Sequence, residues 1–120
     1  MYSAQLLDHF QNPRHAGDLA DADAVVEIEN PVCGDLIRLS VKVADNRITH
    51  LAFKAKGCVP AMACSSAIAE LAFGKSLSEA RRLSPQDVVN TVGGLPQASS
   101  HAAQLAIDAL SAALAKLTPQ

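Results

Sequence analysis

The chain has 120 residues, 49% of them hydrophobic, and a formal net charge of −2. This length suits one hydrophobic core, so we expect a single domain over residues 1–120. Lys and Arg form no cluster, which argues against nucleic acid or an anionic membrane surface as a partner. Residues 1–20 contain neither a secretory apolar segment nor a membrane span, which predicts a cytosolic protein.

The first predicted elements are a short helix and three strands. The helix covers residues 2–10 and stops at Asn12-Pro13, because the residue before a proline avoids the helical region. Apolar and polar residues alternate over residues 24–29, 37–43 and 50–56, which predicts strands. Asp45-Asn46 favours a two-residue hairpin turn between the last two strands, since both residue types tolerate a positive φ.

The second half of the chain has helical patterns. Residues 61–73 predict an alanine-rich helix, with Pro60 at its start and Gly74 after its end. The serines expected to start the three following helices are Ser78 (with Glu79), Ser84 (with Asp87) and either Ser99 or Ser100. The last helix carries an apolar stripe formed by Ala103, Ala106, Ile107, Leu110, Leu114 and Leu117. Strands followed by helices predict an α+β fold, a small three-stranded antiparallel sheet with helices packed on one face.

Two of the three cysteines are predicted to meet at the open end of the hairpin. If Asp45-Asn46 is the turn, paired positions sum to 91, which places Cys33 opposite Cys58 with Cβ atoms roughly 4.5–5.5 Å apart. Asp35 lies at the same tip and offers an oxygen ligand. Cys58 precedes a helix N-terminus, where the macrodipole favours a thiolate. This group predicts a metal or cluster site, whereas a cysteine alone is as often a small buried hydrophobe.

Separate motifs along nearly the whole chain carry a resemblance to a known family. In order they are Tyr2-Ser3, Asp8-His9-Phe10, Asn12-Pro13-Arg14, Cys33-Gly34-Asp35, Gly57-Cys58, Ala63-Cys64-Ser65-Ser66, Gly74-Lys75-Ser76-Leu77 and Leu95-Pro96. Together they resemble the IscU/NifU-type iron–sulfur cluster assembly scaffolds. The resemblance implies that Cys33 and Cys58 are the first two cluster cysteines and that Asp35 is the acid that makes the cluster labile. His101, in the aligned motif of the last helix, is expected as a further ligand.

The resemblance also implies a cargo and partners. A cysteine desulfurase would deliver persulfide sulfur, and acceptor apo-proteins or cluster carriers would receive the finished cluster. Cys33, Asp35, Cys58 and His101 would complete a [2Fe–2S] site within one chain, or two subunits would share a cluster through two cysteines each. The protein would be a scaffold or carrier rather than an enzyme.

Three positions depart from the family pattern. His101-Ala102 stands where the family has His-Cys, so the third family cysteine is absent. The segment Leu95-Pro96-Gln97-Ala98-Ser99 differs from the family's Leu-Pro-Pro-Val-Lys, which speaks against recognition by a dedicated Hsp70 chaperone. Cys64 stands where the family usually has serine.

Several alternatives remain open at this point. Cys64 is in phase with apolar residues of its helix, which favours a buried structural thiol over a relocated ligand or sulfur acceptor. His9, His15 and His50 are interpreted as surface residues. The rival functions are a zinc-bearing acceptor of persulfide sulfur, with Zn²⁺ on the same four residues, and an interaction module that keeps the fold without a cluster.

Overall fold

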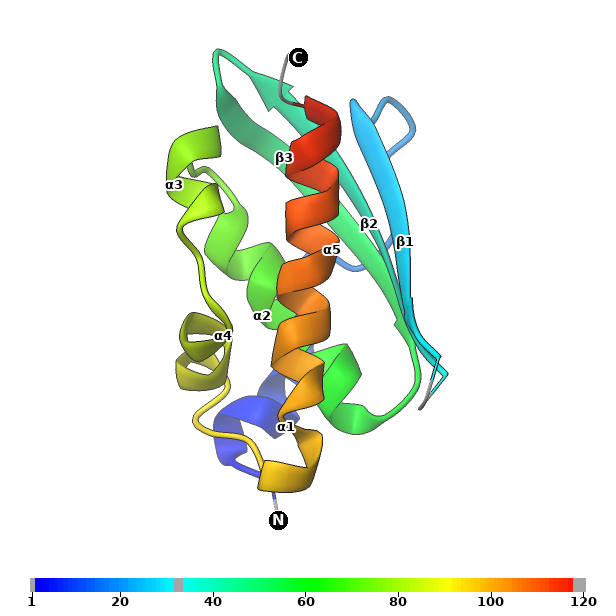
Figure 1. The fold of residues 1–120 in the computed structure, drawn as a ribbon, viewed down its shortest axis with the longest axis vertical. Helices are drawn as coiled ribbons and strands as arrows, with labels where there is room; N and C mark the ends of the chain where they lie inside the picture. Colours follow the sequence, from blue (N-terminus) through cyan, green and yellow to red (C-terminus); the bar gives the residue numbers. More distant parts are fainter. Residues whose placement is uncertain (1, 32–33, 118–120) are drawn as a thin grey trace.

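The structure, a computed structural model, describes residues 2–31 and 34–117. The elements in chain order are α1 (Ala4–Gln11), β1 (Ala24–Asn30), β2 (Asp35–Ala44), β3 (Arg47–Lys56), α2 (Val59–Ala72), α3 (Leu77–Arg81), α4 (Pro85–Thr91), the 3₁₀ turn η1 (Gln97–Ser99) and α5 (His101–Leu117). The strands form an antiparallel sheet in the order β1-β2-β3, and α2 and α5 pack on it (Figure 1). The predicted α+β fold is confirmed.

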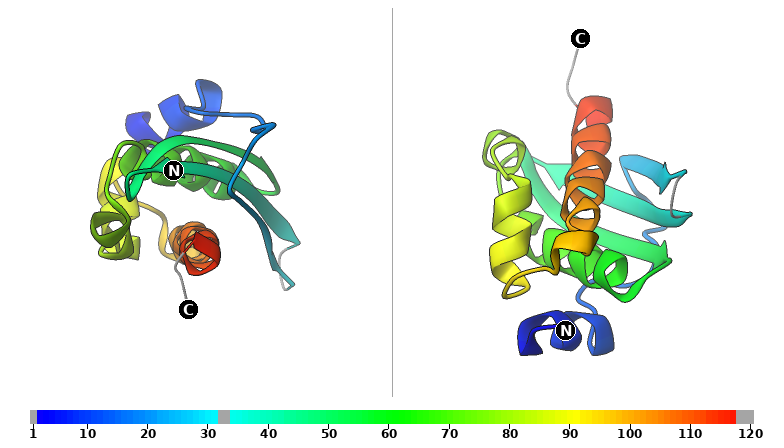
Figure 2. Two further views of the ribbon diagram at one scale, coloured as in Figure 1. Left: turned by 90° about the horizontal axis from the view of Figure 1, so that it is seen from above. Right: turned by 60° about the horizontal axis from the view of Figure 1, so that its bottom comes forward.

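The core lies between the sheet and the two long helices. The sheet is curved, with α5 on its concave side (Figure 2), and fully buried aliphatic residues of β2 such as Leu39 and Val41 face this layer. Helix α2 contacts α1, α4, α5 and β3, so ten of its residues are buried. Its many alanines allow neighbouring elements to approach closely. This enclosure explains why small and apolar residues occur on nearly every side of α2.

The β2–β3 hairpin has the predicted turn but not the predicted register. Asp45 and Asn46 have φ values of 54° and 62°, as a tight hairpin turn requires. A bulge between Lys42 and Val43 leaves Thr49 as an extra residue, so the partner positions beyond it sum to 92, as in Leu36 with Lys56. The uniform sum of 91 that placed Cys33 opposite Cys58 is therefore wrong. One step outward, Asp35 lies against Gly57 instead.

The starts of α4 and α5 agree with the sequence, whereas α1 begins at Ala4 rather than at residue 2, α2 begins at Val59 rather than at residue 61, and α3 has a different cap. Ser76, rather than the predicted Ser78, is the N-cap residue of α3, and its side chain accepts a hydrogen bond from the amide of Glu79. Ser84 and Asp87 form the expected capping box of α4. Helix α5 begins at His101, directly after Ser100, and its predicted apolar stripe packs in the core. Across the described residues, none of these helices is long and apolar enough to cross a membrane.

Candidate metal centre at the hairpin tip

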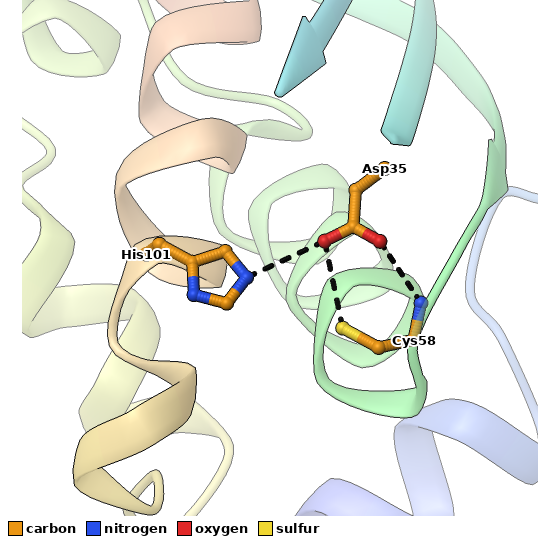
Figure 3. Close-up of side chains that lie close together, drawn as sticks. All are labelled: Asp35, Cys58 and His101. Atoms are coloured by element: carbon orange, nitrogen blue, oxygen red, sulfur yellow. Dashed lines mark hydrogen bonds and ion pairs between the residues drawn. The ribbon is translucent and has the colours of Figure 1, made fainter. Parts of the chain in front are cut away.

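Three chain segments bring one potential ligand each to the tip of the sheet. Asp35 is the first residue of β2, Cys58 is the N-cap residue of α2, and His101 is the first residue of α5. Figure 3 shows the three side chains pointing toward one another. A carboxylate oxygen, Sγ and an imidazole nitrogen all lie within 4.8 Å of one another. One soft, one borderline and one hard donor at this spacing suit a single metal ion or one edge of a cluster.

Asp35 is the centre of this group. Its side chain is buried, and its Oδ1 accepts a hydrogen bond from the backbone amide of Cys58 over 3.0 Å. Its Oδ2 lies 3.6 Å from Cys58 Sγ and 3.4 Å from His101 Nε2, which is an ion pair when the imidazole is protonated (Figure 3). The carboxylate therefore joins the start of α2 to the start of α5. Such contacts hold the three donors together before any cargo arrives.

The thiol of Cys58 differs from the expectation based on its helix position. Packing around the sulfur raises the pKa of Cys58, and the negative charge of Asp35 adds to this rise, although a backbone hydrogen bond involving Ala61 lowers the pKa in part. The predicted stabilisation of the thiolate by the helix N-terminus is therefore outweighed. A metal that binds here has to displace the thiol proton, so binding releases a proton.

The remaining predicted ligand and the remaining cysteine have different outcomes. Cys33 lies outside the described residues, two positions before Asp35 in the sequence. Cys64 is fully buried on α2, as its apolar spacing favoured, and burial raises the pKa of its thiol to about 12. A thiol in this state is protonated and out of contact with solvent.

One histidine that sequence reasoning placed on the surface is in the core. His9 is only 4% exposed, and its Nδ1 lies 2.8 Å from Ser66 Oγ on α2. The same oxygen accepts the amide of Arg14, while His9 Nε2 faces Glu70 at 3.7 Å. The surface interpretation of His9 is wrong because its partner is 57 residues away in the sequence, and only α1–α2 packing reveals it.

The two remaining histidines, His15 and His50, are not part of the metal centre. His50 is exposed, as predicted, and His15 is half-buried, with its ring 4.9 Å from that of Phe73. On the side of α5, His101 lines a hollow of about 240 Å³ together with Glu29 and Asp108. Of the three residues of the centre, His101 alone lines this hollow among the described residues.

Comparison with known proteins identifies the family to which the chain is similar. The family model described as "NifU-like N terminal domain" matches residues 1–119. The iron-sulfur cluster assembly scaffold protein IscU 1 of Archaeoglobus fulgidus is 46% identical over 114 residues, which are 95% of this chain and 74% of the relative. The scaffold protein IscU of Escherichia coli K12 is 39% identical over 118 residues, which are 95% of this chain and 91% of the relative.

A solved structure agrees with these sequence matches. The crystal structure of a putative iron-sulfur cluster assembly scaffold protein for the SUF system from Fervidobacterium islandicum superposes with a TM-score of 0.78. It covers 94% of this chain and 96% of its own at 20% identity, which supports the fold alone. Since the family model and the relatives span most of its length, the chain belongs to the IscU/NifU family.

Proposed function

We propose that the protein is an iron–sulfur cluster assembly scaffold that holds a nascent cluster at the hairpin tip and passes it to acceptor proteins. The observation that carries this proposal is the meeting of Asp35, Cys58 and His101 within 4.8 Å, at the positions where the family motifs occur. Relatives at 46% and 39% identity are named as scaffolds of this kind. The cluster is cargo, built on the protein and then released.

The proposed ligands are Cys58, Asp35, His101 and, from its place in the Cys33-Gly34-Asp35 motif, Cys33. Two thiolates bind iron firmly, whereas a carboxylate oxygen is a harder and more exchangeable ligand. A mixed set therefore suits a cluster that must leave. Ala102 is fully buried and offers no ligand, so one chain supplies two thiols to the tip. This count favours a [2Fe–2S] cluster, held within one chain or shared by two subunits.

The partners follow from the same chemistry. Sulfur has to arrive in a controlled form, and a cysteine desulfurase would deliver it as persulfide sulfur, which needs two electrons from a separate reductant, such as a thiol or a reduced ferredoxin, to become sulfide. Apo-proteins or cluster carriers take the product, and the protein acts as a carrier without turnover on an organic substrate. We place this work in the cytosol. The departure at Gln97, Ala98 and Ser99 from the family's Pro-Val-Lys argues against a dedicated Hsp70 chaperone.

Metal analysis after anaerobic purification tests the proposal. Iron together with acid-labile sulfide, and transfer of both to an apo-ferredoxin, is the expected result. Zinc without sulfide would instead favour a zinc-bearing persulfide acceptor, for which the same donors form a suitable tetrahedral set. A protein with neither metal, before and after reconstitution, would indicate an interaction module and reject the scaffold.

A further inference from the structure

Gly57, which contributes no side chain to the metal centre, is in close contact with Asp35. A methyl group at position 57 would lie 2.0 Å from Oδ1, 2.8 Å from Cγ and 3.0 Å from Cα of Asp35. Real Cβ atoms do not approach other heavy atoms this closely, so any side chain here would push the carboxylate aside. The backbone of Gly57 also has a φ of +135°, which side-chain-bearing residues rarely adopt.

The space beside Gly57 separates the roles of the two Asp35 oxygens. Oδ1 fills that space and accepts the amide of Cys58 over 3.0 Å. Oδ2 points the other way, 3.6 Å from Cys58 Sγ and 3.4 Å from His101 Nε2. With Oδ1 held by the amide, Oδ2 is the oxygen that faces the other two donors.

We propose that Gly57 is a positioning residue for the cargo metal, because it lets Asp35 keep Oδ1 on the Cys58 amide and present Oδ2 alone to the metal. This inference rests on the proposed function. A carboxylate that binds through one oxygen is a weaker ligand than one that binds through two, which suits a site that must give up its cargo. Gly57 thus affects metal affinity without touching the metal.

Gly17 provides a matched control for the conformational cost of an alanine. Its φ of +129° is close to that of Gly57, and a methyl group there would meet no atom within 4 Å. Gly17→Ala therefore places an alanine at a similar positive φ without displacing Asp35. The difference between Gly57→Ala and Gly17→Ala isolates the contact with the carboxylate.

The experiment is an anaerobic titration of the full reduced chain with Co²⁺, followed by visible absorbance. We expect Gly57→Ala to weaken Co²⁺ binding at least tenfold, while the thiolate-to-cobalt band at saturation remains because Cys58 is intact. Gly17→Ala should stay within twofold of wild type. In an Asp35→Ala background, Gly57→Ala should change the affinity less than twofold, since the displaced carboxylate is already gone.

Two results would overturn the inference. One is an equal Co²⁺ affinity of Gly57→Ala and Gly17→Ala. The other is that Gly57→Ala weakens Co²⁺ binding as much in the Asp35→Ala background as in the wild type, which would assign the effect to the Cys58 backbone.

If circular dichroism shows that Gly57→Ala does not fold, the variant Asp35→Asn tests the inference instead. The side-chain amide oxygen of this variant can keep the hydrogen bond from the Cys58 amide, while its NH₂ group takes the place of Oδ2. We therefore expect the Co²⁺ affinity of Asp35→Asn to be as low as that of Asp35→Ala. Wild-type affinity in Asp35→Asn would contradict the proposal. A wild-type chain without Cys58-dependent Co²⁺ binding would reject the proposed function as well.

Discussion

Cys58 caps the start of α2 and Cys64 lies within this helix six residues later, and the structure assigns them opposite roles. Replacing Cys64 with alanine removes a fully buried sulfur from a helix that is enclosed by α1, α4, α5 and β3. The lost transfer free energy is about 0.8 kcal/mol if sulfur counts as a methylene group. The cavity term raises the total to about 1–2 kcal/mol, because closely packed neighbours relax little.

This cost in unfolding free energy corresponds to a fall of about 3–10 °C in the thermal midpoint of a chain of this size. The iron content after reconstitution should stay at the wild-type level. Cys64→Ser should be milder than Cys64→Ala, because a hydroxyl on this helix can donate to the carbonyl four residues earlier, as Ser65 does to Ala61 over 2.8 Å.

Cys58→Ala, at the N-cap of the same helix, is the matched control. Cys58 is exposed, and its side chain makes no capping hydrogen bond, so its replacement should leave the midpoint nearly unchanged. Iron binding should be lost, since the tip loses a thiolate. The paired assay is the thermal midpoint and the iron content of both variants. A Cys64→Ala protein with a wild-type midpoint and no iron would refute the assignment of Cys64 to the core.

The remaining predictions concern Asp35, the Cys58 proton and His9. Asp35→Ala should slow cluster transfer to an apo-ferredoxin, even though its affinity for a single metal ion falls, because without the exchangeable oxygen ligand a recipient thiol enters less easily; transfer faster than wild type contradicts this role. Zn²⁺ affinity should increase with pH through the neutral range, since the raised pKa of Cys58 leaves a proton to displace, and competition with a chelator at several pH values would detect a flat profile that speaks against thiolate binding. Burial, assisted by the charge of Arg14, lowers the pKa of His9 below its ordinary 6.5, so the stability it contributes is complete above pH 6.5 and is lost as the pH falls toward the folded-state value. Urea unfolding should show a weaker pH dependence in His9→Gln, and an unchanged dependence would dissociate His9 from the effect.

Much of the fold was predictable because its signals are local. Alternation gave the strands, Asp45-Asn46 gave the turn, and Ser84 with Asp87 gave the start of α4. Ser76 was missed although its signal is also local: Ser76 and Glu79 have the three-residue spacing of a capping box, and both hydrogen bonds of the box form. Ser78 stands directly before Glu79 and has Arg81, not an acidic residue, three positions later.

The metal centre was predictable in its members and not in its geometry. The motifs identified Asp35, Cys58 and His101 as neighbours, and the described part of the chain brings them together. The register failed because one extra residue, Thr49, is accommodated by a bulge without a Gly or Pro to mark it. That single residue sets Asp35 against Gly57. The raised pKa of Cys58 is likewise a tertiary effect, since the partial desolvation of its sulfur and the nearby carboxylate of Asp35 come from packing around the helix end.

Anaerobic reconstitution with iron and sulfide tests the central claim most directly, with visible absorbance and iron and sulfide analysis of wild type, Cys33→Ser and Cys58→Ser. The account predicts a sulfide-to-iron charge-transfer spectrum with equal iron and sulfide in the wild type. Each serine variant should stay folded and lose this spectrum. A wild-type spectrum in either variant would contradict a cluster held at the hairpin tip by both thiols.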